Sequence, residues 1–207
     1  MGDYTMIRMI VMLSLLMGSA AMADTPVKRL FEQERVALGR ISGEIRASYL
    51  QRPEVDLDYS KEWLSTQQVS QGGDQWRCLA EALYFEARGE SVKGQFAVAE
   101  VILNRVDSEE FPDTVCGVVH QGTGRKYACQ FTYTCDGHEE VIGNPAAFRQ
   151  VAKVARLTLD GAPRRLTDGA THYHTKAVNP RWARVFPRTA TIGVHHFYRM
   201  PTRLSSN

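Results

Sequence analysis

The sequence lacks the features that mark several large classes of protein. It has no internal repeat and no low-complexity segment, which excludes a repeat protein and a tail-like, disordered chain. It contains neither a CxxC pair nor an HExxH motif, so cysteine-rich zinc sites and the familiar helical zinc motif are not indicated. The formal net charge is only +2 and no basic run is dense, so we expect no nucleic-acid partner.

After residue 23 no apolar run is long enough to span a bilayer, but the first 23 residues resemble a secretory signal peptide. Arg8 precedes the run MIVMLSLLMGSAAMA, which ends in the small-x-small pattern Ala21-Met22-Ala23. This run has about 15 residues, whereas a spanning helix needs roughly 20. We therefore expect export and cleavage near Ala23. An uncleaved membrane anchor is the alternative.

Four cysteines, an even number, fit two disulfides in an oxidising compartment. Three pairings are open. We favour Cys129 with Cys135, which closes the short segment CQFTYTC, and Cys78 with Cys116.

The composition is globular, with 43% hydrophobic and 23% charged residues. Apolar spacing predicts an amphipathic helix within 27–50, followed by a polar connector that ends near residue 75. Further helices are expected at 76–88, 92–106 (capped by Ser91) and 145–160, and a short one within 108–121. Residues 122–138 suggest a loop or small hairpin, and 170–200 suggest irregular strands. The fold class is α+β, mainly helical. The expected parts are a signal peptide (1–23), an N-terminal helix and connector (24–75), a domain (76–200) and a tail (201–207).

Two glutamates in the segment FEARGE stand between apolar helices. Glu86 is expected in the last helical turn, where the helix dipole and burial beside Phe85 and Tyr84 raise the pKa of a carboxyl group. A carboxylic acid that stays protonated near neutral pH is what general-acid cleavage of a glycosidic bond requires. A solvated or ion-paired glutamate is the alternative for Glu86.

Three further charged residues of this region have structural interpretations. We expect Glu90 to cap the following helix, where a negative charge is favoured. Arg88 can pair with either acid or orient a substrate. Glu100 lies in the most apolar helix, so if it is buried it must be paired, with Arg105 or Arg88 as the expected partner.

Several segments together resemble a known family. They are CLAEALYFEARGESVKGQFAVAEVILNRVDSEEFPDTVCGVVHQ, CQFTYTCDG, ATHYHTKAVNPRW and TIGVHHFYR, which cover about residues 76–199 in order. They are similar to the cell wall hydrolases of the spore cortex-lytic enzyme family. The resemblance leaves residues 24–75 uncovered, and this sequence has Thr132 where the family often has serine.

The resemblance implies a lysozyme-like catalytic domain with a small irregular β part that cuts the glycan strands of peptidoglycan without a cofactor or metal. Glu86 matches the family's catalytic glutamate and would be the acid and base of a lytic transglycosylase. Hydrolysis would instead need a second carboxylate, for which Asp136 is better placed than Glu90. The expected substrate-binding residues are Tyr84, Arg88, Gln130, Phe131, Asp136, Tyr173 and His174. Asp136-Gly137 is equally consistent with a simple turn.

Two other functions stay open. Six histidines, among them the HYH and HH segments, suggest a zinc-dependent N-acetylmuramoyl-L-alanine amidase, although their spacing is not that of a ligand set. A non-catalytic glycan-binding protein would keep the same fold. We expect a monomer that is periplasmic or cell-wall associated, and the sequence leaves a regulatory protein partner unspecified.

Overall fold

The computed structural model describes residues 25–40, 57–68, 71–125 and 128–201. The chain divides into two compact units, residues 1–53 and 54–207. In the first unit, helix α2 spans Thr25–Arg40 and confirms the start of the predicted amphipathic helix. The predicted signal peptide and the rest of that helix (41–50) lie outside the described residues. Among the described helices, none has the length and hydrophobicity that a bilayer crossing requires.

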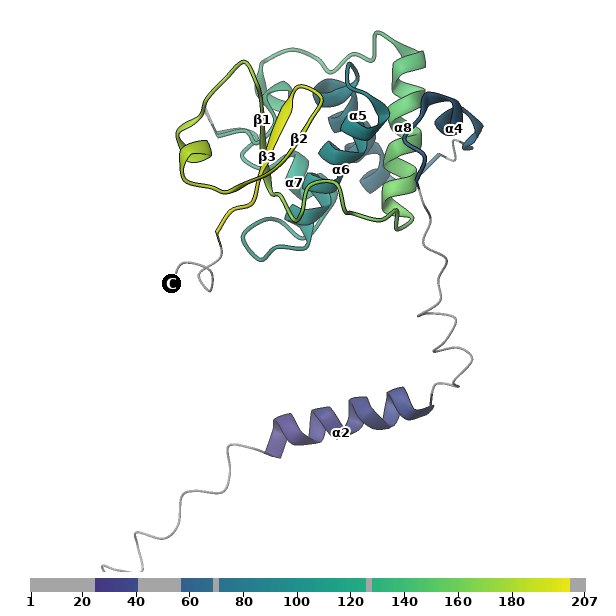
Figure 1. Ribbon diagram of the computed structural model, residues 1–207, viewed down its shortest axis with the longest axis vertical. Helices are drawn as coiled ribbons and strands as arrows, with labels where there is room; N and C mark the ends of the chain where they lie inside the picture. Colours follow the sequence, from purple (N-terminus) through teal and green to yellow (C-terminus); the bar gives the residue numbers. More distant parts are fainter. Residues whose placement is uncertain (1–24, 41–56, 69–70, 126–127, 202–207) are drawn as a thin grey trace, which may run out of the picture. The chain divides into compact units, whose positions relative to one another are not determined.

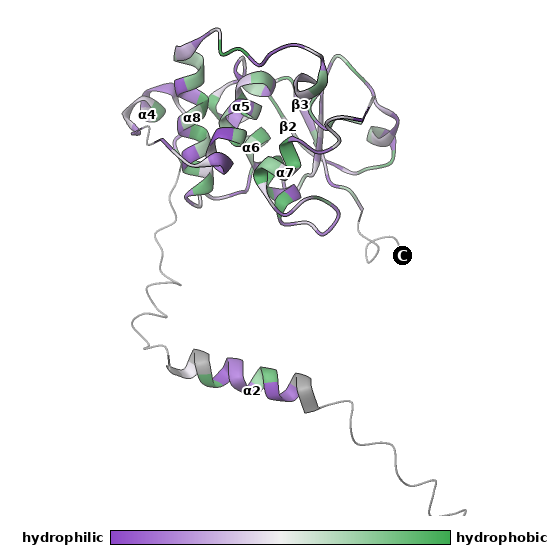
Figure 2. Cartoon of the chain, turned by 180° about the vertical axis from the view of Figure 1, so that it is seen from behind, coloured by the Kyte–Doolittle hydropathy of each residue, from purple (hydrophilic) through white to green (hydrophobic). Residues whose placement is uncertain are grey.

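Three long helices form the body of the second unit (Figure 1). They are α5 (Asp74–Ala87), α6 (Val92–Val106) and α8 (Pro145–Leu159), and α5 packs against both of the others. The short helix α7 (Val115–Val119) packs on α5 and α6. Apolar residues colour much of α6 and α7, whereas α8 alternates between hydrophobic and hydrophilic residues (Figure 2). The centre of the core is therefore α6, which is buried on nearly every side.

Side-chain caps set where these helices begin. The Ser91, Thr114 and Asn144 oxygens each accept a hydrogen bond from a backbone N–H three residues later. Such a bond satisfies one of the N–H groups that the first helical turn leaves unpaired, and contributes about 1 kcal/mol. Pro145 occupies the first turn of α8, where its missing N–H costs nothing.

A three-stranded antiparallel sheet lies beside the helices, with the order β1-β3-β2. The strands are β1 (His172–Thr175), β2 (Arg188–Ile192) and β3 (His195–Tyr198). Because neighbouring strands pair Tyr173 with Phe197 and His174 with His196, the sheet has two distinct faces. Tyr173, His195 and Phe197 contact one another on one face, which we call the inner face. On the other face lies a second group of rings, the outer ring cluster, which consists of His172, His174, Trp182 and Tyr198.

The packed domain extends further upstream than the predicted start at residue 76. Helix α4 (Lys61–Thr66) lies in the predicted connector and packs on α8. Leu57 and Leu64 are buried in the common core, and Lys153 Nζ donates to the carbonyl oxygens of Leu64 (3.1 Å) and Ser65 (2.7 Å). The connector was predicted as a spacer because most of its residues are polar. Its buried residues Leu57 and Leu64 nevertheless pack it on the domain.

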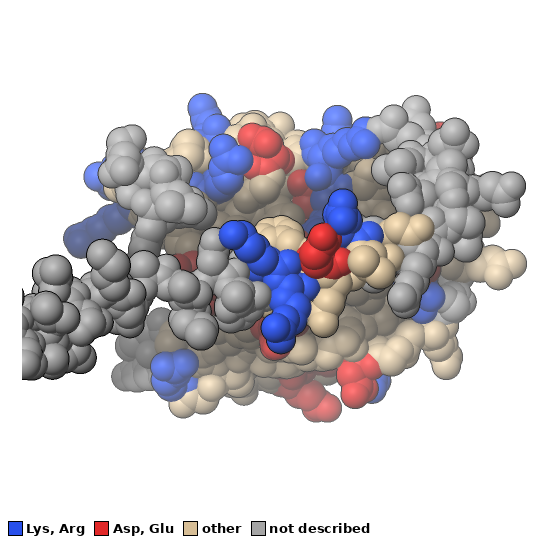
Figure 3. All heavy atoms as spheres, turned by 90° about the horizontal axis from the view of Figure 1, so that it is seen from below, with Lys and Arg blue, Asp and Glu red and all other residues tan. Residues whose placement is uncertain are grey.

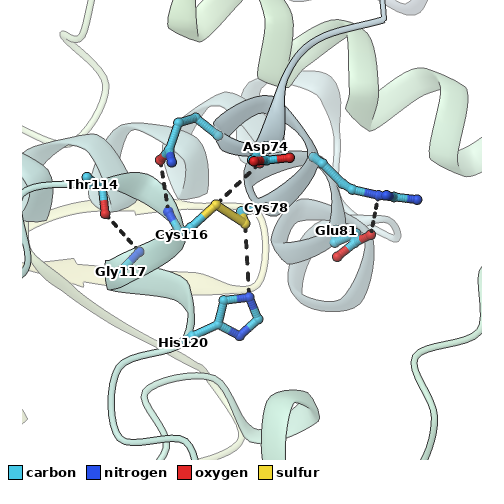
Figure 4. The surroundings of a disulfide bond; sticks show 9 residues. Asp74, Cys78, Glu81, Thr114, Cys116, Gly117 and His120 are labelled. Carbon is cyan, nitrogen blue, oxygen red and sulfur yellow. Dashed lines mark hydrogen bonds and ion pairs between the residues drawn. A yellow bond between two sulfur atoms is a disulfide. The ribbon is translucent and has the colours of Figure 1, made fainter.

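The described residues of this segment, 122–125 and 128–138, contain no strand and form a loop with a 3-10 turn, η1 (Thr132–Cys135), so the hairpin alternative is wrong. The disulfide Cys129–Cys135 closes a short segment within this loop, and a second disulfide joins Cys78 of α5 to Cys116 of α7. This is the pairing that the spacing favoured. Around the longer bridge, the Cys116 N–H donates to Gln75, and the His120 ring lies 4.0 Å from the Cys78 sulfur (Figure 4). With a sequence separation of 38 between the two cysteines, loop closure contributes about 4 kcal/mol in the chain-entropy model.

Candidate active site

Glu86 lies in the last turn of α5, next to the helix's final residue, and its side chain is half-buried. The Tyr173 hydroxyl of β1 donates a hydrogen bond to Glu86 Oε2 at 3.2 Å. Burial raises the pKa of Glu86, while the Tyr173 hydrogen bond and the positive charge of Arg105 act in the opposite direction without cancelling it. Within the described residues no hydrogen bond reaches Oε1, so this oxygen is available to carry a proton toward a ligand.

Arg105 of α6 is a member of this site that the sequence did not identify. It is 2% exposed, and its Nε donates to the carbonyl oxygen of Thr171 at 2.6 Å. Burial lowers the pKa of Arg105 to about 10, and the nearby Tyr173 and Glu86 partly restore it. The signal in the sequence was an arginine inside an almost wholly apolar helix, where it must meet partners from elsewhere.

Gln130 joins this buried arginine to the η1 loop. With its amide oxygen turned toward Arg105, Gln130 accepts from both terminal guanidinium nitrogens at 3.2 Å. Phe131 follows it and is 2% exposed, with the Arg105 guanidinium carbon 5.7 Å from its ring centre. Phe131 is therefore a core residue, and its predicted role as a stacking surface for sugars is wrong.

Two other residues that we predicted to contact the substrate, Tyr84 and Arg88, interact with other residues of the protein. Tyr84 is 3% exposed, and its hydroxyl accepts the N–H of Asn144 at 2.9 Å. Arg88 is exposed and lies over the Tyr84 ring at 4.7 Å, so it pairs with an aromatic face rather than with Glu86 or Glu90. Tyr84 is thus a structural residue, while Arg88 keeps an exposed guanidinium.

Glu90 does not cap α6, because Ser91 does so. The Glu90 carboxylate is 7% exposed, accepts the N–H of Val194 at 3.1 Å and lies 3.2 Å from His195 Nδ1. A Cβ atom on Gly193 would overlap this carboxylate, so the turn between β2 and β3 needs a glycine there. Glu90 fixes that turn to the α5–α6 junction.

The buried Glu100 has a different partner from the one predicted. It is 2% exposed, and its carboxylate accepts from the N–H groups of Leu166 and Thr167, both at 2.9 Å, and from the Thr167 hydroxyl at 2.5 Å. No arginine is among these donors. Backbone N–H groups supply the compensation that we expected from an ion pair.

Asp136 is exposed, and its carboxylate accepts the N–H of His138 at 2.9 Å. This is the local turn geometry that the sequence left as one of two interpretations.

Phe85, next to Glu86, stacks on Tyr133 of η1 with 4.4 Å between ring centres. Burial raises the pKa of the Tyr133 phenol, and the negative charges of Glu81, Glu86 and Glu140 add to this effect.

The four histidines of the strands lie on the two faces of the sheet, His195 on one and His172, His174 and His196 on the other. His195 packs edge-on against Tyr173, with 5.2 Å between ring centres, while His174 stacks on Tyr198 and contacts its hydroxyl at 3.0 Å. His174 is thus part of the outer ring cluster, whereas Tyr173 contacts Glu86. Among the described residues, no three His, Cys, Asp or Glu side chains are grouped as metal ligands would be.

The profile of the family described as Cell Wall Hydrolase matches residues 89–198. The spore cortex-lytic enzyme of Halalkalibacterium halodurans is 37% identical over 120 residues, which are 58% of this chain and 33% of that protein. The spore cortex-lytic enzyme of Bacillus cereus is 34% identical over 119 residues, 58% of this chain and 42% of that protein. The chain therefore spans between a third and a half of the length of these relatives.

The chain is also similar to a solved structure, described as the catalytic domain of the germination-specific lytic transglycosylase SleB from Bacillus anthracis. The identity is 32%, the alignment covers 64% of this chain and 99% of that one, and the TM-score is 0.48. Glu86 lies just before the first residue of the profile match. The match covers more than half of the sequence, including β1 to β3 and the η1 loop, and the chain belongs to the cell wall hydrolase family.

Proposed function

We propose that this protein cleaves the bond between N-acetylmuramic acid and N-acetylglucosamine in peptidoglycan as a lytic transglycosylase, with Glu86 as general acid and base. The observation that carries the proposal is the environment of Glu86. It is a half-buried carboxyl group with a raised pKa, one oxygen held by Tyr173 and the other without a described donor. The family and the names of the curated relatives support the substrate class.

The first step follows from the protonated state of Glu86. Because burial favours the neutral acid, the carboxyl group keeps a proton at a pH where an exposed glutamate is ionised. With Oε2 held by Tyr173, the proton is carried on Oε1 and is donated to the glycosidic oxygen as that bond breaks. The sugar then develops an oxocarbenium-like centre.

The second step uses the carboxylate that the first step leaves behind. Glu86 accepts the proton of the muramic C6 hydroxyl, whose oxygen attacks the cationic carbon and closes a 1,6-anhydro ring without consuming water. Tyr173 and the charge of Arg105 stabilise the carboxylate in the interval. The same groups therefore keep Glu86 from being too weak an acid for the first step.

The position of Glu90, one of the two expected second carboxylates, favours this route over hydrolysis. Glu90 is buried and held by Val194 and His195, and Asp136 binds its own turn. A water-activating base has to face the substrate across the bond from the acid, and the buried Glu90 is held by other partners and cannot do so. Asp136 is exposed and stays the alternative base that the sequence predicts. Activity on peptidoglycan also fits the predicted export of the chain.

Digestion of purified peptidoglycan, with products identified by mass spectrometry, tests the proposal. Wild-type protein with intact disulfides should release anhydro-muramic products, and Glu86→Gln should release none. Glu81→Gln is the matched control, since Glu81 lies on the same helix and pairs with Arg77 at 3.3 Å. Reducing-end products would replace the transglycosylase with a hydrolase, and free peptides would replace it with an amidase. Binding without any product would favour a glycan-binding protein.

A further inference from the structure

The modest net charge of the chain conceals a strong separation of charge within the second unit. Residues 57–160, which include the long helices, contain fifteen Asp and Glu against ten Lys and Arg. Residues 161–201, which carry the sheet, contain seven Lys and Arg and a single acid, Asp168. On the face drawn in Figure 3, basic and acidic side chains lie among each other, so the separation is not evident from one view. The basic residues of the sheet region need an explanation of their own.

Four of these cations lie on the segment that runs from the end of β1 to the first residue of β2, which we call the basic loop (residues 176–188). They are Lys176, Arg181, Arg184 and Arg188, and all four side chains are exposed. Within the described part of the chain, none of them forms an ion pair. By contrast, Arg164 pairs with Asp107, and Arg199 lies 4.0 Å from Asp168. The basic loop thus presents unneutralised positive charge.

Aromatic residues of the basic loop pack it against the sheet. Its 3-10 turn η2 (Arg181–Arg184) places Trp182 against His172 and Tyr198, with ring centres 5.1 and 5.3 Å apart. Phe186 also contacts the His172 ring, at 5.0 Å. The large rings therefore face the sheet, and the outward side consists of cationic side chains with Val178 and Val185, which are 55% and 73% exposed. Because the aromatic residues point inward, this surface suits charged groups better than the interior of a bilayer.

The basic loop and Glu86 lie on opposite faces of the sheet. Tyr173, which binds Glu86, contacts His195 and Phe197 on the inner face, whereas Trp182 lies on the outer ring cluster. Figure 1 shows the segment between β1 and β2 extending from the sheet on the side away from α5 and α8, and Figure 2 shows the same from behind. The loop is therefore a second surface and not a part of the catalytic site.

We propose that the basic loop binds the carboxylate groups of the peptide stems of peptidoglycan, and so holds the protein on the polymer that Glu86 cleaves. This inference rests on the proposed function, because it takes the substrate to be peptidoglycan. The stems give that polymer a high density of negative charge. The basic loop attracts this charge while the acidic helical part is repelled, so the field of the domain orients it on the wall.

Sedimentation with insoluble sacculi tests this, in a Glu86→Gln background that prevents digestion. One variant carries Arg181→Gln, Arg184→Gln and Arg188→Gln. The matched control carries Lys93→Gln, Arg125→Gln and Arg149→Gln, three exposed cations on other elements, so both variants lose the same net charge. We expect the loop variant to bind about 10-fold more weakly at low salt and the control to bind within about twofold of the parent. Added salt should bring parent and loop variant together.

Three further arms identify the binding partner. Sacculi stripped of their stems by an amidase should no longer distinguish the loop variant from the parent. Equal weakening of the two variants, or loop-dependent binding to stripped glycan, would overturn the proposal. Loop-dependent binding to phosphatidylglycerol vesicles or to duplex DNA, without binding to sacculi, would assign the surface to another polyanion. Loop-dependent binding by a wild-type protein that releases no glycan product would refute the proposed reaction and leave this inference standing.

Discussion

Replacing Tyr173 with phenylalanine isolates the hydrogen bond that partly offsets the effect of burial on the pKa of Glu86. The substitution removes one oxygen atom and leaves the ring that packs on His195 and Phe197. The lost interaction is the hydroxyl donor to Glu86 Oε2. Since a hydrogen bond to a carboxylate favours its charged form, its removal must raise the pKa of Glu86 further.

The size of the effect follows from the geometry. At 3.2 Å the bond is longer than the roughly 2.5–2.7 Å of strong O–H···O⁻ bonds. We therefore take the lower end of the range for bonds to charged groups, about 1.5 kcal/mol, which makes Glu86 an acid about tenfold weaker. The first step needs protonated Glu86, so kcat/KM falls as pH rises through its pKa. In Tyr173→Phe this decline should move to higher pH, and the plateau should fall by up to about tenfold because the carboxylate is less stabilised.

The assay is the initial rate of release of soluble anhydro-muropeptides from sacculi across the acid and neutral pH range. Tyr198→Phe is the control, because its hydroxyl contacts His174 and not Glu86. The control should lower neither the plateau nor the pH of the decline. A decline in Tyr173→Phe that stays in place, or moves to lower pH, would refute the assignment of Tyr173 as the donor that acidifies Glu86.

Two further predictions concern stability. The pKa of Glu86 is raised by folding, so the folded state binds this proton more tightly, and stability is lost as pH rises from the ordinary glutamate pKa through the raised one. Glu86→Gln should therefore gain stability over wild type across that window in urea denaturation, and a constant difference would contradict the raised pKa. Gly193→Ala should cost about 3 kcal/mol, because φ is +57° and the new methyl group displaces Glu90. Gly124→Ala, at φ +84° with open space around it, should cost only about 1 kcal/mol, and equal losses would show that backbone strain alone matters.

The helices were predictable because their signals are local. Ser91 and Asn144 cap α6 and α8 by bonds to residues only three positions away, and Pro145 occupies the first turn of α8. The fold class was predictable for the same reason, because assigning a mainly helical α+β class requires only that helices be told from strands. Helix α4 was missed because its stability comes from α8, through Leu64 and Lys153, and not from its own six residues.

The candidate site was less predictable, because burial depends on contacts between distant segments. Tyr84 and Phe131 have the chemistry of sugar-stacking residues, yet both are needed in the core. Arg105 and Glu100 lie five positions apart on one helix, which suggested a pair. Instead Arg105 meets Thr171 and Glu100 meets Thr167, on a segment more than sixty positions later. No local sequence pattern tells whether a buried charged side chain pairs with a neighbour on its own helix or with backbone groups of a distant segment.

The two acids of FEARGE show why spacing alone does not assign a role. Glu86 lies in the last turn of α5, while Glu90 follows the turn at Gly89 and precedes the cap of α6. The four-residue separation therefore no longer places them on one helical face. Tyr173 donates to Glu86, and His195, two positions along the partner strand from the residue opposite Tyr173, lies against Glu90. Each acid is matched to a different residue of the same sheet face, and Glu90 fixes the turn that positions the strand beside Tyr173. Glu86 is the proposed acid and base, and Glu90 positions the sheet from which Tyr173 donates to it.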